Sequence, residues 1–245
     1  MRSLIPDGPD FAGPAELLDV LDADRPRAPA HRPAVTTNMV MSLDGAYALE
    51  GRSGGLGSPG DKAMFLAQRS LADVVLVGAS TVRAERYRRP SVGPEAARVR
   101  ARRGQAERPL LVIATRRAAL PADLPLLSGG EPEPLVACPD SADISGLPDG
   151  VGVLRCGATE VDFTALLGTL HDRGARHVVC EGGPALLGQL AAADLVDEFL
   201  LTLSPRLVGG NSVGLLAGAA AASEAFTLHR VLRDGDHLLL SYRRA

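Results

Sequence analysis

The stretch HVVCEGGPALLGQL, residues 177–190, places a carboxylate and two glycines where an apolar run meets a helix-forming run. The apolar run before Glu181 is typical of a buried strand, and Pro184 suits the first position of a helix. Gly182 and Gly183 therefore have two interpretations. They form a simple turn, or they let an anion approach the free N–H groups at the helix start. The spacing is neither GxGxxG nor a P-loop, so neither motif decides between them.

Composition narrows the class of protein. The 245 residues have a net charge of −3, 46% hydrophobic residues and 3% aromatic residues, which argues against a nucleic-acid partner. No apolar run is long enough to span a membrane and no leader pattern is present, so we expect no membrane association and a soluble, cytoplasmic protein. The three cysteines lack metal-ligand spacing, so we expect reduced core thiols and no metal site.

The order of predicted elements indicates the fold class. Residues 1–33 are predicted to be an N-terminal arm with a short helix at 14–24, and residues 34–245 one domain in which strands and helices alternate. Alternation predicts an α/β fold with a parallel sheet. Residues 226–244 predict an antiparallel hairpin turning at Asp234–Gly235, so the sheet is mixed. The other predicted strands are 33–42, 73–80, 109–115, 134–138, 151–156, 175–181 and 196–205, and the other predicted helices are 58–72, 161–175 and 184–195.

Polar segments follow four of the predicted strands. They are SLDG at 42–45, GAST at 78–81, ATRR at 114–117 and EGGP at 181–184. Ligands of such sheets bind beyond the carboxyl ends of the strands. Four ligand-friendly strand ends in one sheet favour the interpretation of EGGP as a nucleotide phosphate site.

Five segments occur in an order that resembles one family: NMVMSLDGAYA, RSGGLGSPGDKAMFLAQR, VVLVGASTVRAE, VVCEGGPALLGQL and LVDEFLLTLSPRLVGG. Over roughly residues 34–243, the chain resembles the reductase domain of bifunctional riboflavin-biosynthesis proteins. The resemblance implies a dihydrofolate-reductase-like fold, with a mostly parallel sheet flanked by helices, and a homodimer. It also implies an NADPH-dependent oxidoreductase that reduces the ribosyl side chain of 5-amino-6-(5-phosphoribosylamino)uracil to the ribityl form. No zinc-ligand pattern of a deaminase is present, so a stand-alone reductase is expected.

The resemblance also implies roles for individual residues. Those expected to bind substrate are Asn38, Ser53, Arg69 and Glu181. Those expected to bind NADPH are Met41, Gly55, Gly78, Ala79, Thr81, Glu85, Thr115, Arg116, Gly182, Gly183, Pro184, Ala185, Leu186, Leu187 and Gly188.

Two carboxylates are candidates for a catalytic role. Hydride transfer requires the nicotinamide and the acceptor carbon in close contact, and a nearby carboxylate favours a protonated, more reactive imine. Glu181 ends a buried strand, where an unpaired carboxylate would be costly, so we expect it to be functional. Asp44 precedes a glycine in SLDG, so fixing a turn is the alternative role for it.

Three interpretations of other residues stay open. Arg69 either meets a substrate phosphate or is a solvated helix residue. Thr115 and Arg116 offer the hydroxyl and cation that an NADP 2′-phosphate needs, or form a charged loop. Residues 83–108 contain nine arginines, interpreted mostly as a mobile surface loop, with a lid over a phosphorylated substrate as the alternative.

The sequence indicates the substrate less clearly than it indicates the cofactor. Where relatives have DDPxLTxR, this chain has AERYRRPSVGPEAARVRARR, and Asn38 stands where many relatives have lysine. A reductase of a pterin such as dihydrofolate and a non-catalytic nucleotide-binding relative are therefore the alternatives to a phosphorylated pyrimidine reductase. The segment VDEFLLTL at 196–203 is a candidate dimer seam or a central strand.

Overall fold

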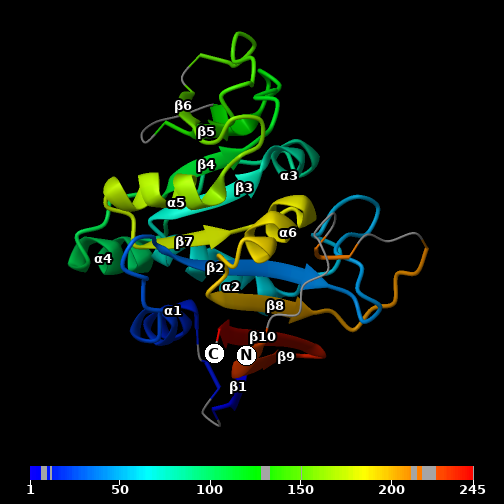
Figure 1. Ribbon diagram of the computed structural model, residues 1–245. Helices are drawn as coiled ribbons and strands as arrows, with labels where there is room; N and C mark the ends of the chain where they lie inside the picture. Colours follow the sequence, from blue (N-terminus) through cyan, green and yellow to red (C-terminus); the bar gives the residue numbers. More distant parts are fainter. Residues whose placement is uncertain are drawn as a thin grey trace.

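A ten-stranded sheet dominates the computed structural model, which describes residues 1–6, 10–11, 13–127, 133–149, 151–210, 214–216 and 225–244. The strand order is β1-β9-β10-β8-β2-β7-β3-β4-β5-β6 (Figure 1). The strands are β1 (Arg2–Ile5), β2 (Ala34–Met41), β3 (Val74–Gly78), β4 (Leu110–Ala114), β5 (Leu135–Cys138), β6 (Gly152–Arg155), β7 (His177–Cys180), β8 (Glu198–Leu203), β9 (Phe226–Asp234) and β10 (His237–Arg244).

The sheet is mixed and mostly parallel, which confirms the predicted fold class. Strands β8, β2, β7, β3, β4, β5 and β6 pair in parallel, in that order. The predicted hairpin of β9 and β10 is present and joins β8 in antiparallel fashion, but it turns at Gly235 and Asp236, one residue later than predicted. Strand β8 has a neighbour on each edge, so the segment interpreted as a possible dimer seam is a central strand.

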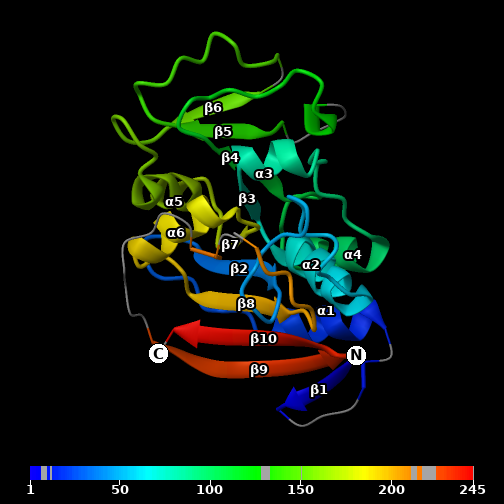
Figure 2. The ribbon, with the colours of Figure 1, turned by 90° about the vertical axis from the view of Figure 1, so that its right-hand side faces the viewer.

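Helices cover both faces of the sheet, as Figure 2 shows edge-on. Leucines of α5 and α6 pack with strand residues such as Val35 and Leu76 on one face. Val82 of α3 packs on the other face, where α1, α2 and α4 form a further cluster with Leu200 and Leu232. The helices are α1 (Pro14–Ala23), α2 (Pro59–Leu71), α3 (Ala79–Ala84), α4 (Pro94–Arg102), α5 (Phe163–Asp172) and α6 (Pro184–Ala192), with a 3₁₀ turn at Pro125–Leu127. In the described part of the chain, no helix is long and apolar enough to cross a membrane.

The start of α2 follows the capping pattern of its sequence. The hydroxyl of Ser58 accepts a hydrogen bond of 3.1 Å from the backbone N–H of Asp61, and Pro59 occupies the first turn. Asp234, from the β9–β10 hairpin, accepts hydrogen bonds of 2.7 Å from the Ser58 hydroxyl and the Gly60 amide. The hairpin therefore fixes the position of this helix start.

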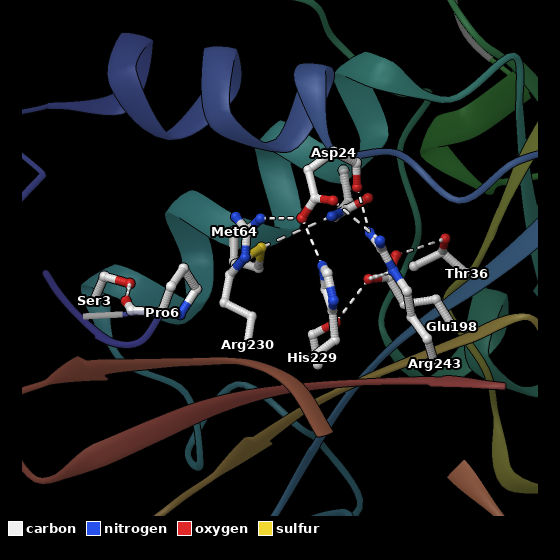
Figure 3. A network of polar contacts seen from close by, with 11 residues as sticks. Ser3, Pro6, Asp24, Thr36, Met64, Glu198, His229, Arg230 and Arg243 are labelled. Atoms are coloured by element: carbon white, nitrogen blue, oxygen red, sulfur yellow. Dashed lines mark hydrogen bonds and ion pairs between the residues drawn. The ribbon is translucent and has the colours of Figure 1, made fainter. Parts of the chain in front are cut away.

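The N-terminal arm is attached to the far edge of the sheet. Its first residues form β1, which pairs with β9 and was not predicted. Asp24 accepts hydrogen bonds from His229 at 2.6 Å, from Arg243 at 3.0 Å and from Arg230 (Figure 3). Glu198 of β8 accepts a further bond of 3.1 Å from the same Arg243. Asp24 therefore ties the arm directly to β9 and β10, and Arg243 extends the network to β8.

The arginine-rich stretch 83–108, which was interpreted mostly as a surface loop, contains a packed helix. It contains the end of α3 and the whole of α4, and α4 packs on α2 through Ala96 and Val99. Arg100 is 1% exposed and donates hydrogen bonds to the carbonyl oxygens of Ser70 and Ala72. This helix was not predicted, because its sequence is rich in arginine and has few apolar positions.

Candidate active site

Two adjoining cavities open at the carboxyl ends of the parallel strands, where the sequence placed its polar segments. Both are lined by Ser80 and Gly183. The first has a volume of about 460 Å³, and the second about 880 Å³. Residues of the first that come from the predicted set are Asn38, Ser53, Thr81, Glu85, Glu181, Gly183 and Pro184. Residues of the second from that set are Gly78, Ala79, Thr115, Arg116, Gly183, Ala185 and Leu186.

Arg69 and Glu181 form a two-point ion pair, in which Glu181 lines the first cavity and Arg69 lines neither cavity. Arg69 Nε lies 2.7 Å from Glu181 Oε1, and Nη2 lies 2.8 Å from Oε2. The side chains are 12% and 2% exposed. Burial raises the pKa of the Glu181 carboxyl, and the Arg69 guanidinium opposes that rise. Arg69 is therefore not a solvated helix residue, which was one of its two interpretations, but part of a buried ion pair.

Two aromatic rings hold the Arg69 guanidinium. Its Cζ atom lies 4.2 Å from the centre of the Phe65 ring and 4.9 Å from the centre of the Tyr87 ring. The Tyr87 hydroxyl is buried and has no hydrogen-bond partner among the described residues. Both rings line the first cavity, so the guanidinium that they contact lies next to this cavity without lining it.

Ser53 and Glu85 are also brought together. Glu85 Oε1 accepts hydrogen bonds of 3.0 Å from the Ser53 amide and 3.2 Å from the Ser53 hydroxyl. Glu85 follows the last turn of α3, and Ser53 lies in the loop before α2. The contact closes one side of the first cavity with a carboxylate.

The two glycines of EGGP have different roles. Gly182 has a φ of +76°, and a Cβ there would lie 3.1 Å from the Met39 side chain. Gly183 has a φ of −75° and caps α6, where a Cβ would lie 2.8 Å from Thr81 Oγ1. The Gly182–Gly183 peptide is cis, and Gly182 O accepts a 2.7 Å hydrogen bond from the Gly78 amide. The backbone at Gly183 therefore carries no side chain on the side that faces Thr81.

Some predicted site residues lie away from both cavities. Met39, two residues earlier on β2, lines the first cavity where Met41 does not. A Cβ at Gly55 would meet Leu49, and that glycine lines neither cavity. Leu187 and Gly188 are buried in the interior side of α6.

Asp44 is engaged in holding a loop. Its carboxylate accepts hydrogen bonds from the Ser42 hydroxyl and from the amides of Val208 and Gly209, the latter at 2.6 Å. These contacts, with Ser42 the largest contributor, lower the Asp44 pKa to about 2. The geometry favours the turn-fixing alternative stated for this residue, which lines neither cavity.

Arg116 and Thr115 line the second cavity at the end of β4. Arg116 Nη1 lies 3.1 Å from Glu160 Oε1, with side chains 59% and 60% exposed. The Thr115 hydroxyl accepts a 3.3 Å hydrogen bond from the Arg117 amide. An exposed pair of this kind contributes little to stability, so Arg116 can exchange its partner for a ligand anion.

The residues of the first cavity that sequence reasoning missed include Asp61, Phe65 and Tyr87. A signal for two of them was present, because Asp61, Phe65 and Arg69 follow one another at four-residue spacing and so share one face of α2. Burial raises the pKa of the Asp61 carboxyl. Tyr87 lies where the sequence departs from its relatives, and no local pattern indicated it.

Comparison with known proteins is consistent with this geometry. The chain is 27% identical over 216 residues to the 2,5-diamino-6-ribosylamino-4(3H)-pyrimidinone 5′-phosphate reductase of Archaeoglobus fulgidus, covering 86% of this chain and 98% of the relative. The enzyme of that name from Methanothermobacter thermautotrophicus is 26% identical over 219 residues, with the same coverage.

Solved structures share the fold. A pyrimidine reductase-like protein from Corynebacterium diphtheriae superposes with a TM-score of 0.82 at 20% identity, covering 95% of this chain and 98% of that one. Acinetobacter baumannii RibD gives 0.71 at 22% identity, over 88% of this chain and 59% of that protein.

The family model described as the RibD C-terminal domain matches residues 33–240. This match confirms the resemblance drawn from the five sequence segments. The chain belongs to the RibD C-terminal domain family and is an oxidoreductase of the pyrimidine reductase type.

Proposed function

We propose that this protein uses NADPH to reduce the ribosylamino side chain of a pyrimidine 5′-phosphate to its ribityl form. Family membership and the names of the two archaeal relatives support the reaction. The observation that carries the proposal is the pair of adjoining cavities that share Gly183, one lined by the Glu181 carboxylate and the other by the Arg116 cation. A dinucleotide fits this arrangement, with its nicotinamide in the first cavity and its adenosine in the second.

The residues present fit NADPH. The N-terminus of α6 directs free N–H groups past Gly183, where a phosphate can approach because no side chain intervenes. Thr115 and Arg116 supply a hydroxyl and a cation for the 2′-phosphate. When bound, NADPH supplies the hydride. Met39 and Thr81 then border the nicotinamide, because both line the first cavity next to the EGGP backbone.

The Arg69–Glu181 pair orients the substrate. Two of the guanidinium nitrogens are committed to Glu181, and among the described residues Nη1 has no hydrogen-bond partner. Nη1 is therefore the guanidinium nitrogen that is left for a substrate phosphate, although Arg69 itself does not line the cavity. The Glu181 carboxylate lies beside it and stabilises positive charge at the imine nitrogen during hydride transfer. Ser53 and Asn38 contribute polar groups to the rest of the first cavity.

Turnover with purified substrates tests this function. NADPH oxidation is followed by absorbance with the diaminopyrimidinone, with the corresponding uracil and with dihydrofolate, in separate assays. Activity with either ribosylaminopyrimidine phosphate is expected, and their ratio identifies the natural ring. Turnover of dihydrofolate alone would instead support the pterin alternative. NADPH binding without any turnover would support the non-catalytic alternative.

The homodimer stays part of the proposal. β1 forms one edge of the sheet and carries the exposed side chains of Leu4 and Ile5, which are 37% and 43% exposed. Leu228 on the neighbouring β9 is 39% exposed. An apolar edge strand of this kind is suited to contact with a second copy of the chain.

A further inference from the structure

A third cavity, of about 700 Å³, lies at the opposite end of the sheet from the candidate active site. Asp73, Arg108 and Arg176 line it, and each directly precedes a parallel strand or lies within two residues of one. The same strands, β3, β4 and β7, end at the active-site cavities. At about 3.3 Å per residue, the five-residue strand β3 separates the two ends by roughly 15 Å.

The lining of this cavity is strongly basic. Its arginines come from the arm, from α4 and the loop after it, and from the loop after α5. They are Arg25, Arg100, Arg103, Arg108, Arg173 and Arg176. Among the lining residues Asp73 alone is acidic. In a chain with a net charge of −3, this concentration of positive charge is local.

Asp73 forms no direct ion pair with these arginines among the described residues. Its Oδ2 accepts hydrogen bonds of 2.8 and 2.9 Å from the amides of Arg176 and His177. Its Oδ1 accepts a 2.5 Å bond from the side chain of Gln105. Its single negative charge acts favourably on Arg25 and Arg100, but the six lining guanidinium groups outnumber it.

Arg100 places a buried charge in the wall of the cavity. It is 1% exposed, its acceptors are carbonyl oxygens, and its Nη2 has no partner among the described residues. Burial lowers the pKa of Arg25 to about 10, and repulsion from Arg103 adds to this effect. The Asp22 carboxylate is shared by two arginines: it lies 2.5 Å from Arg103 and 3.9 Å from Arg25. Buried charge in a medium of low dielectric strengthens the field in the opening above it.

Arg108 and Arg173 are available to a ligand. Both are exposed, and neither has an ion pair or a side-chain hydrogen bond among the described residues. They approach the cavity from different elements, since Arg108 precedes β4 and Arg173 ends α5. Two guanidinium groups that line one cavity from separate elements can both donate N–H groups to a phosphate, whose oxygens accept paired donors.

We propose that this cavity is a second anion site, which binds a small phosphorylated ligand independently of the active site. Arg108 and Arg173 contact the phosphate oxygens, and Arg25, Arg100 and Arg103 supply the surrounding field. The cavity is large enough for a diphosphate or a nucleotide. This inference does not depend on the reaction proposed above.

Calorimetric titration of the full chain with inorganic pyrophosphate at low ionic strength tests the site. The test variant is Arg108→Ala with Arg173→Ala. The matched control is Arg98→Ala with Arg102→Ala, which removes the same charge from exposed arginines that do not line the cavity. Both variants leave the cofactor cavity intact, so any pyrophosphate bound there contributes equally to each.

Saturable binding to the parent is expected, with a Kd raised at least tenfold in the test variant and within twofold of the parent in the control. Circular dichroism and melting curves establish that both variants are folded, which is expected because the four side chains are exposed. Equal affinities of the two variants would show that binding follows net charge alone and would overturn the site, as would absence of saturable binding to the parent.

Discussion

Arg69 on α2 and Glu181 at the end of β7 are joined by two charge-assisted hydrogen bonds of 2.7 and 2.8 Å, although 112 residues separate them. The two side chains thus act as one unit. The family resemblance assigned each of them to the substrate, and the structure adds that each also determines the position of the other. Substitution of either residue therefore changes both stability and substrate binding.

Arg69→Ala is expected to destabilise the fold by about 3–5 kcal/mol, because it leaves a buried carboxylate without its partner. Arg69→Ala combined with Glu181→Gln is expected to recover part of this loss, since the remaining group is neutral. Urea unfolding of the two variants and the parent measures the difference. An unfolding free energy of Arg69→Ala equal to that of the parent would show that the pair contributes nothing.

Gly183→Val is expected to raise the Kd for NADPH at least tenfold. The φ of −75° permits valine, so the obstacle is space, because the new Cβ would lie 2.8 Å from Thr81 Oγ1. Gly168→Ala is the control, since a Cβ there meets nothing within 4 Å. Fluorescence titration with NADPH, after a melting curve on each variant, gives the comparison. Parent-like affinity in a folded Gly183→Val protein would leave EGGP as a simple turn.

Arg116→Ala is expected to weaken NADPH binding by about ten- to a hundredfold, the loss of one charge-assisted contact, and to leave NADH binding unchanged. Stability is expected to stay constant, because the Glu160 pair that is lost is more than half exposed. Titration with both cofactors measures the ratio. Equal weakening for NADH would place Arg116 away from the 2′-phosphate.

The stability of the fold is expected to depend on His177 below neutral pH. Burial lowers the His177 pKa from 6.5 to about 3, and the nearby Arg25 and Arg103 add to this while Asp73 opposes it. Between these two values, His177 is protonated in the unfolded chain and neutral in the folded chain. Stability is fully present above pH 6.5 and falls, by on the order of a few kcal/mol, as the pH decreases toward 3.

His177→Gln is expected to flatten this acid-side decrease, whereas His31→Gln, at an exposed histidine, is expected to retain it. Unfolding free energies measured at several pH values give the slopes. Identical slopes for His177→Gln and the parent would assign the decrease to other groups.

Light scattering is expected to give a mass near twice the 25.5 kDa of one chain. Ile5→Asp is expected to shift the population toward the monomer, because it places a charge on the apolar edge strand β1. If the parent has the mass of one chain, the homodimer proposal is wrong. If the parent is a dimer that Ile5→Asp leaves unchanged, the dimer contact lies on another surface.

The elements that could be predicted were those with a local signal. The alternating apolar runs predicted the parallel strands, and Ser58 and Pro59 predicted the start of α2. The strand ends also predicted where the cavities lie, because parallel strands bring their carboxyl ends to one edge. The site residues that are contiguous in the sequence follow from these elements.

The features that were missed depend on distant partners. β1 is four residues long and acquires its structure only by pairing with β9. The pairing of Arg69 with Glu181 joins a helix to a strand, and neither residue has a local pattern that names the other. The two glycines could not be distinguished either, because the positive φ belongs to Gly182 and the short approach to Thr81 belongs to Gly183.

The attachment of the arm to the last strands sets an order for biosynthesis. Arg2 pairs with Arg233, and Asp24 binds residues of β9 and β10, so the partners of the arm are translated long after the arm itself. While the ribosome is still making the chain, α1 and the other elements before β9 can form, but β1 has no strand to pair with. The edge of the sheet is thus completed only once β9 has been translated, by a contact between residues that are far apart in the sequence.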